Sequence, residues 1–197
     1  MSKRFYTTRA TALRCCLLAT LVLGMLSAGS VNAQNVNVAG ALVGNGTYAT
    51  LGAAFAAING GAQGGANIAV TIVANTNEGT ASAVLNQSSA PWATLTIQPS
   101  GGAFTVTGAT TAGQPLIDLS GADNVTIDGL NSSGNALTIQ NTTVATTSGT
   151  STIRFIGDAT NNVITRCAIQ GSSTMTTTTN GGTIWFAAGA VTTGNDN

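Results

Sequence analysis

One order of residues occurs twice in this chain and begins a third time. LIDLSGADNVTIDGL (116–130) and IRFIGDATNNVITRCAI (153–169) each contain an apolar strand, a turn of small residues that ends in Asn, and a second apolar strand. Leu119 aligns with Phe155 at a separation of 36 residues and Ile127 with Ile164 at 37, while Phe186 lies 31 residues beyond Phe155. A strand and turn order that recurs with inserts of variable length is typical of a solenoid.

Short β-branched runs follow one another from Asn67 onward, separated by Gly, Asn, Ser and Pro. They are IAVTIVA, TLTIQP, AFTVTG, PLIDLSG, NVTIDGL, ALTIQN, TIRFIG, NNVITRCAIQ and TIWFAAG. Each has the length and the partial alternation of a strand. Because no second helical pattern interrupts them, βαβ winding is excluded and a sandwich, a barrel or a solenoid remains. The recurrence favours the solenoid, since a sandwich does not require it.

A single amphipathic segment, YATLGAAFAAINGG (48–61), precedes these runs. Leu51, Phe55 and Ile58 fall at i, i+4 and i+7, which places them on one face of a helix. Thr50 is a suitable N-cap and Gly60-Gly61 ends the pattern. The segment therefore predicts one short helix before the first strand.

The stretch GADNVTIDGL (121–130) predicts how one coil is built. Val125, Ile127 and Leu130 are expected to point inward, while Thr126 and Asp128 point outward. Asn124, just before the strand, can adopt left-handed backbone geometry and turn the chain. In stacked coils each such Asn would lie about 4.8 Å from its counterpart, so a ladder of Asn side chains is expected.

Residues 1–33 have the organisation of a signal peptide. A basic start is followed by the short apolar run CCLLATLVLGMLS (15–27), and VNA (31–33) offers small residues for cleavage after Ala33. The alternative is a membrane anchor, but the run is shorter than the roughly 20 residues needed to cross a bilayer. We therefore expect export to the cell surface or the extracellular space, with no stable membrane insertion after cleavage.

Removal of this leader changes the charge of the chain. Two arginines would then stand against six carboxylates, which gives a net charge of 2 − 6 = −4. Binding of nucleic acid is disfavoured, because it needs clustered Lys and Arg. One cysteine would also remain, Cys167, so no intramolecular disulfide can form. The charged residues concerned are Arg154, Arg166, Glu78, Asp118, Asp123, Asp128, Asp158 and Asp196.

The sequence offers few residues for catalysis. The chain has no His, which excludes a Ser-His-Asp triad and an imidazole zinc site. Cys167 aligns with Leu130 of the preceding copy and is interpreted as a small core residue rather than a nucleophile. We therefore assign no catalytic, cofactor-binding or metal-binding residue and expect no cofactor.

The carboxylates and arginines of the two copies form the only candidate cluster for catalysis. Asp118, Asp123 and Asp128 could serve with Arg154, Asp158 and Arg166 as an acid and base set, or could hold Ca²⁺. However, Asp123 falls in a turn, and Asp118 and Asp128 are on different strands that can face different sides. Ordinary solvated side chains are the favoured interpretation.

Two tryptophans and two Thr-rich inserts are candidates for binding. Trp92 and Trp185 could stack on sugar rings, although Trp185 within TIWF is expected to be packed. Residues 141–152 and SSTMTTTT (172–179) are expected to be loops extruded from a coil, which a solenoid tolerates at little cost. Ice binding is disfavoured, because the strands lack a regular Thr-x-Thr ladder.

GADNVTIDGL, NNVITRCAIQ and YATLGAAFAAINGG resemble the right-handed parallel β-helix proteins of the pectate-lyase-like superfamily, particularly the N-terminal portions of large exported bacterial surface proteins. The resemblance spans residues 36–197. It implies an all-β, right-handed parallel β-helix (solenoid) over residues 34–197, with the helix at 48–61 as its N-terminal cap. Fold alone does not imply function.

The segment GNDN (194–197) corresponds to the turn that precedes an inward strand in the other copies. A solenoid needs a cap at its end. The domain is therefore expected to be incomplete at its C-terminus and to continue into downstream domains, and the alternative is a short chain capped by self-association.

Two functions remain open on the sequence. The favoured one is an exported, noncatalytic, adhesin-like surface protein whose β-helix is a stalk or a scaffold that binds carbohydrate or a surface. Its expected partner is a polysaccharide or a cell-surface glycan. The alternative is the N-terminal part of a polysaccharide lyase or glycoside hydrolase, and Ca²⁺ would be a cofactor only in the lyase.

Overall fold

The computed structural model describes residues 33–86, 90–171 and 180–188. The chain divides into two units at Asn32–Ala33, and the described residues belong to the second. The expected leader before Ala33, the insert 172–179 and the turn 194–197 lie outside the described residues.

The described residues form one short helix, α2 (Leu51–Asn59), and a series of strands. The strands are β1 (Val36–Ala39), β2 (Gly46–Tyr48), β3 (Asn67–Ile72), β4 (Thr76–Asn77), β5 (Ala83–Asn86), β6 (Thr94–Pro99), β7 (Ala103–Gly108), β8 (Pro115–Ser120), β9 (Val125–Asp128), β10 (Ala136–Asn141), β11 (Ser151–Ile156), β12 (Val163–Thr165), β13 (Ala168–Gly171) and β14 (Gly182–Phe186).

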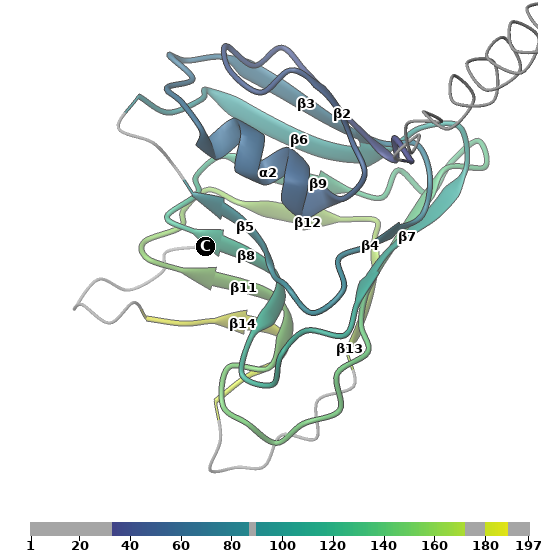
Figure 1. Ribbon diagram of the computed structural model, residues 1–197, viewed down its shortest axis with the longest axis vertical. Coiled ribbons are helices and arrows are strands. Elements are labelled where there is room, and N and C mark those ends of the chain that lie inside the picture. Colours follow the sequence, from purple (N-terminus) through teal and green to yellow (C-terminus); the bar gives the residue numbers. More distant parts are fainter. Residues whose placement is uncertain (1–32, 87–89, 172–179, 189–197) are drawn as a thin grey trace, which may run out of the picture. The chain divides into compact units, whose positions relative to one another are not determined.

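These strands wind into a right-handed parallel β-helix of about four turns, as the sequence predicts. Sheet A has the order β12-β9-β6-β3-β1-β2, sheet B the order β13-β10-β7-β4 and sheet C the order β14-β11-β8-β5. Each coil contributes one strand to each sheet, so β3, β4 and β5 form the first coil and β12, β13 and β14 the fourth (Figure 1). The two alternative architectures, the sandwich and the barrel, are therefore excluded.

The register of the coils is the one expected from the recurrence. Ile127 pairs with Ile164 in sheet A, and Leu119 pairs with Phe155, which pairs in turn with Phe186 in sheet C. The inward residues of successive coils thus stack in rows along the axis of the solenoid. These rows form one continuous apolar column.

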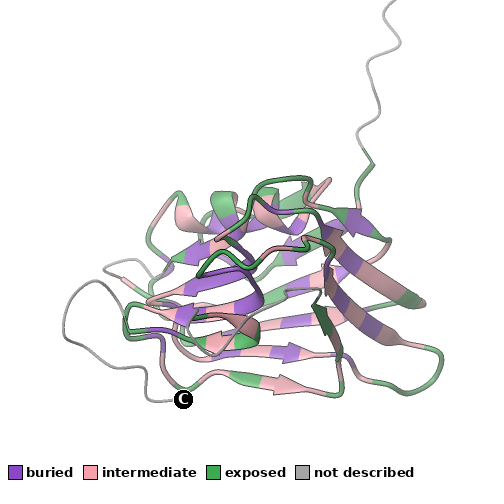
Figure 2. Ribbon diagram, turned by 90° about the horizontal axis from the view of Figure 1, so that it is seen from below, coloured by how far each residue is buried: buried purple, intermediate pink, exposed green. Residues whose placement is uncertain are grey.

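Burial alternates along β3, β6, β9 and β10, whereas β8 is buried continuously from Pro115 to Leu119 (Figure 2). Val125 and Ile127 of β9 are buried, whereas Thr126 and Asp128 are half-buried on the outer surface. Leu130 does not extend the inward row, because it lies in the following turn with a φ of 58° and is half-buried there. The expectation that Leu130 points inward is therefore wrong, because the turn directs this residue away from the inward row.

The corner between sheets C and A depends on Asn. Asn124 and Asn161 occupy equivalent turns, and both have a φ of 56°, which confirms the left-handed geometry expected of Asn124. The next residue, Asn162, accepts a hydrogen bond at Oδ1 from the Val125 N–H (2.9 Å) and donates from Nδ2 to the Ala122 carbonyl (2.8 Å). In place of the expected side-chain ladder, these contacts join an Asn side chain to the backbone of the coil below.

Helix α2 covers the N-terminal end of the column, above β5 (Figure 1). Leu51, Phe55 and Ile58 are buried, and the Thr50 hydroxyl accepts a hydrogen bond from the Ala53 N–H (3.1 Å), as predicted. The Glu78 carboxylate, which follows β4, also accepts from the N–H groups of Leu51 (3.0 Å) and Gly52 (2.8 Å). A negative charge at a helix N-terminus is stabilising, so Glu78 ties the cap to the first coil.

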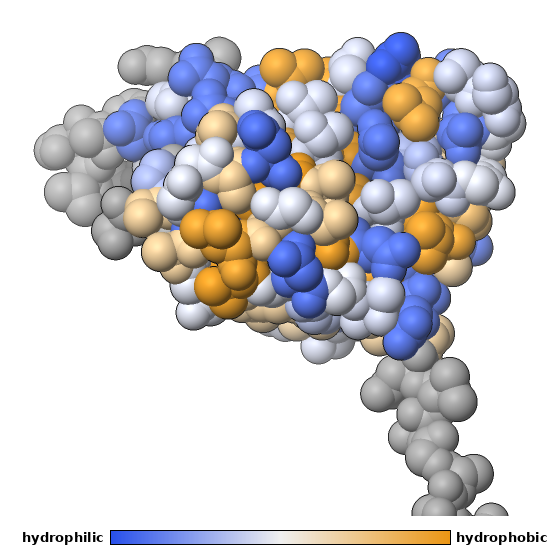
Figure 3. All heavy atoms as spheres, turned by 90° about the horizontal axis from the view of Figure 1, so that it is seen from above, coloured by the Kyte–Doolittle hydropathy of each residue, from blue (hydrophilic) through white to orange (hydrophobic). Residues whose placement is uncertain are grey.

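Two further features change the strand edges at this end. Strand β1 pairs antiparallel with β3 and β2 pairs antiparallel with β1, so sheet A ends here in an antiparallel hairpin. Asn59 donates to the Val84 carbonyl (2.9 Å) and accepts from the Asn86 N–H (2.9 Å), so its amide covers the edge of β5. Figure 3, which views the molecule from above Figure 1, shows hydrophilic residues between separate apolar patches on this side.

One buried hydroxyl within the column lacks a partner in the described residues, and this leads to a first prediction. Thr76 of β4 is 2% exposed, and its Oγ1 makes no hydrogen bond. Its row continues with Val106, which is apolar. We expect Thr76→Val to raise the free energy of unfolding by about 1 kcal/mol, because an unsatisfied buried hydroxyl is removed without a change of shape. Urea unfolding measures this.

Thr110 provides the control for that substitution. It is 3% exposed, and its Oγ1 donates to the Gln114 carbonyl (3.1 Å) and accepts from Asn141 Nδ2 (3.0 Å). Thr110→Val should therefore lower the free energy of unfolding by about 1 kcal/mol. A destabilising effect of Thr76→Val would contradict the assignment of its hydroxyl as unsatisfied.

Candidate binding surface

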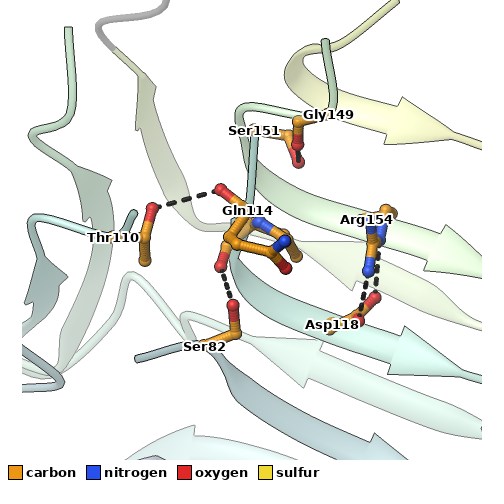
Figure 4. A network of polar contacts seen from close by, with 8 residues as sticks. Ser82, Thr110, Gln114, Asp118, Gly149, Ser151 and Arg154 are labelled. Atoms are coloured by element: carbon orange, nitrogen blue, oxygen red, sulfur yellow. Dashed lines mark hydrogen bonds and ion pairs between the residues drawn. The ribbon is translucent and has the colours of Figure 1, made fainter. Parts of the chain in front are cut away.

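The carboxylates and arginines of the candidate catalytic cluster are distributed over separate parts of the solenoid. Asp118 on β8 accepts two hydrogen bonds from Arg154 on β11, at 2.9 and 2.6 Å, on the outer face of sheet C (Figure 4). Asp128, at the end of β9 in sheet A, is held in the same way by Arg166. Asp118 and Asp128 thus lie on different sheets, so they do not form an acid and base pair on one face.

The remaining acidic residues of that cluster lie in turns. Asp123 accepts hydrogen bonds from the N–H (2.7 Å) and the hydroxyl (2.9 Å) of Thr160 in the next coil. Asp158 is exposed in the turn after β11. Among the described residues, no group of three or more His, Cys, Asp or Glu side chains could hold a metal ion. The cluster therefore supports the contacts between coils.

The two tryptophans differ in their surroundings. Trp92 is 2% exposed, and its Nε1 donates to the Asp123 carbonyl (2.8 Å), so the hypothesis that Trp92 stacks on sugars is wrong. Trp185 on β14 is half-buried, and the guanidinium carbon of Arg154 lies 5.9 Å from its ring centroid. This geometry is that of a cation–π contact and confirms that Trp185 is packed.

Cys167 is partly buried and packs against the core, as predicted, although Leu130, with which it was aligned, lies outside the core. The thiol is half-buried, and burial raises its pKa to about 11. At neutral pH it is therefore protonated, and a protonated thiol is a poor nucleophile.

The outer face of sheet B is uniform in its chemistry. Every outward position of β7, β10 and β13 is Ala, Thr or Gln, and Asn77 occupies the outward position of β4. The register aligns these side chains in two polar rows, Asn77–Thr107–Gln140–Gln170 and Thr105–Thr138–Ala168. Hydroxyl and amide groups thus repeat along the solenoid at the strand spacing of about 4.8 Å.

A hollow of about 280 Å³ adjoins this face at the corner between sheets A and B. Its lining includes Asn131, Thr138, Arg166 and Cys167. A Cβ at Gly129 would lie 2.1 Å from the Arg166 carbonyl oxygen, so only glycine permits this close approach of the coils. We name the outer face of sheet B and this hollow together the sheet B surface.

Sequence reasoning did not identify this surface. The signal was present, because Thr105 and Thr138 lie 33 residues apart and Gln140 and Gln170 lie 30 apart in similar strands. However, polar residues alternate with apolar residues in strands of all three sheets. The alternation therefore does not indicate which strands share a sheet.

The first Thr-rich insert is shorter than expected and is packed. Asn141 and Thr152 are buried ends of β10 and β11, and the loop comprises residues 142–150. It stacks on the loop of the preceding coil, since the Thr143 hydroxyl donates to the Thr110 carbonyl (2.6 Å) and Gly113 N–H donates to the Thr150 hydroxyl (2.8 Å). Figure 4 shows part of the polar network at this corner.

No family model, curated protein or solved structure matches this chain. In the part of the chain that the structure describes, no helix has the length and apolar character needed to span a membrane.

The Asp128–Arg166 pair leads to a prediction of pH dependence. Arg166 holds the pKa of the Asp128 carboxyl below its ordinary value, and the Leu130 N–H adds to this effect while burial opposes it. Because the pKa is lower in the folded state, the charged carboxylate stabilises the fold above the ordinary pKa of about 3.9 and this contribution is lost as the pH falls. The wild-type protein should therefore lose free energy of unfolding as the pH falls from about 5 to about 3, the range in which carboxylates titrate, and the Asp128→Asn variant should lose less.

Urea unfolding at each pH measures this effect. Equal pH dependence in the wild-type protein and the Asp128→Asn variant would contradict the role given to the pair.

Proposed function

We propose that this protein is an exported, noncatalytic, adhesin-like surface protein, and that its β-helix is a rigid scaffold that binds a polysaccharide or cell-surface glycan through the sheet B surface. The expected leader at residues 1–33 supports export, and the resemblance to N-terminal portions of exported bacterial surface proteins supports a place at the cell surface.

The observation that carries the proposal is the pair of polar rows on sheet B. Sugar hydroxyls both donate and accept hydrogen bonds, and the Thr and Gln side chains of these rows do the same. The parallel ladders on both sides of β7 and β10 hold the rows in fixed positions. Binding to a rigid face costs little ordering of the protein, and a repeating face suits a repeating polymer.

The charges favour a neutral glycan over an acidic one. The expected mature chain has a net charge of 2 − 6 = −4, which repels polyanions. Its two arginines, Arg154 and Arg166, are each bonded to an aspartate. Neither is therefore a free cation for a uronate.

One observation favours the alternative, the N-terminal part of a polysaccharide lyase or glycoside hydrolase. Arg166 lines the hollow of the sheet B surface and holds Asp128, so a basic and an acidic group lie close to the proposed binding face. Under this alternative cleavage products would form from a polysaccharide, and Ca²⁺ would be a cofactor only in the case of a lyase.

The chain offers a matched test, because the tripeptide TIQ occurs on two sheets. Thr138 and Gln140 of β10 face outward on sheet B, and Thr96 and Gln98 of β6 face outward on sheet A, all half-buried. The double variant Thr138→Ala/Gln140→Ala should lose about 30-fold in affinity for a neutral glycan found on an array, since two hydrogen bonds of about 1 kcal/mol each are removed. Thr96→Ala/Gln98→Ala should bind as the wild type does.

Equal loss in the two double variants, or no binding of any glycan by the wild-type chain, would refute the proposed surface. Release of new reducing ends or unsaturated products from an acidic polysaccharide would favour the enzyme instead.

A further inference from the structure

The last described coil leaves the apolar column uncovered. Ile153 and Phe155 of β11 are 0% and 2% exposed, whereas their partners in the next coil, Ile184 and Phe186 of β14, are 41% and 54% exposed. A hollow of about 330 Å³ lies here between these residues and Ile164. The inward side chains of the fourth coil thus form an exposed apolar surface, which we name the fourth-coil surface.

The strand edges at this surface lack proline and charged residues, two of the features that usually prevent edge pairing. β12, β13 and β14 are the terminal strands of their sheets in the described residues. Their sequences VIT, AIQG and GTIWF contain no proline and no charged residue. Natural proteins usually block exposed edges with such residues, so these edges can pair with a further strand.

The opposite end of the solenoid is closed to the apolar column of another copy. There α2 seals the column and Asn59 covers β5, while β2 and β4 remain the terminal strands of sheets A and B. Head-to-tail stacking of copies would require this end to open. Between copies of this chain, the fourth-coil surface can therefore meet the same surface of another copy but not the sealed end.

The chemistry of the surface is compatible with such a contact. Its lining residues Phe155, Asn162, Ile164, Ile184 and Phe186 are uncharged, so a surface that faces its own copy meets no like charge. The rings of Phe155 and Phe186 are stacked, with centroids 4.8 Å apart and planes at 7°. The other face of the Phe186 ring can continue this stack with a second ring.

We propose that two copies of this chain associate through their fourth-coil surfaces about a two-fold axis, with Phe186 and the edge of β14 at the contact. A two-fold axis perpendicular to the solenoid pairs β14 antiparallel with its copy and closes the assembly at two chains. The dimer would present two sheet B surfaces, but it does not depend on glycan binding.

Light scattering coupled to size exclusion tests this on the chain from Ala33 to Asn197, the compact unit that contains the solenoid. We expect twice the chain mass at micromolar concentration. Phe186→Asp should raise the dimer dissociation constant at least about 100-fold, because it places two carboxylates at the contact. Phe186 is half-exposed, so the variant should still fold, and circular dichroism and the unfolding midpoint check this.

Leu42→Asp is the matched control. Leu42 is 67% exposed and lies in the segment between β1 and β2, at the closed end. This variant should dimerise as the wild type does. A wild-type chain that is monomeric at all concentrations, a dimer that survives Phe186→Asp, or growth into longer oligomers would overturn the proposal.

Discussion

Arg154→Met should lower the free energy of unfolding by about 3 kcal/mol, because it leaves the Asp118 carboxylate buried without its partner. The side chains of Arg154 and Asp118 are 16% and 8% exposed, and two hydrogen bonds join them across β11 and β8. Removal of one member of a buried pair costs more than the pair itself contributes, since the remaining charge stays desolvated. Urea unfolding at neutral pH measures the loss.

The second ion pair of the solenoid is the control for this experiment. Arg166 makes the same two bonds to Asp128, but its side chain is 53% exposed. The Asp128 side chain is 13% exposed beneath it, and loss of the exposed arginine opens this carboxylate to water, so Arg166→Met should cost clearly less. Replacement of both buried partners, Asp118→Leu with Arg154→Met, should restore most of the stability. Equal losses in the two arginine variants would contradict the importance of burial.

Leu119→Ala should lower the free energy of unfolding by about 3 kcal/mol, because it opens a cavity in the middle of the apolar column. Leu119 is 1% exposed and lies between Leu85 of the coil below and Phe155 of the coil above. Neighbouring coils are held apart by their backbone ladders and cannot close the cavity fully. Thermal and urea unfolding of the variant measure the effect.

Leu42→Ala tests the same change of side chain at an exposed position. Leu42 is 67% exposed, so its truncation should change the free energy of unfolding by less than about 0.5 kcal/mol. A small effect of Leu119→Ala would show that the rows of inward residues are not the main source of stability.

Local and periodic features of the fold were predictable from the sequence. Helix α2 requires only the spacing of Leu51, Phe55 and Ile58 and a cap at Thr50, all within a few residues. The register of Ile127 with Ile164 was predictable as well, because inward positions must be apolar in every coil and the turn at Asn124 recurs at Asn161. These signals repeat in the sequence because every coil must bury the same inward positions and turn at the same corners.

Contacts between distant residues were not predictable in the same way. Glu78 caps α2 from the end of β4, 27 residues after Leu51, and nothing near either residue indicates this. Trp92 was a candidate for sugar stacking, yet it is buried, because its indole reaches the Asp123 carbonyl in the next coil. Asp118 and Arg154 lay in successive copies, but their pairing required the register and the common outward direction of both side chains.

The sequence LTIQ shows what the sequence alone determines and what only the tertiary structure decides. It occurs at residues 95–98 and again at 137–140, and in both places its alternation alone determines that Leu and Ile are buried and that Thr and Gln face outward. The tertiary structure decides that the first copy belongs to sheet A and the second to sheet B. The physical reason is that alternation acts within one strand, whereas the sheet a strand joins depends on how many corners the chain has turned before it.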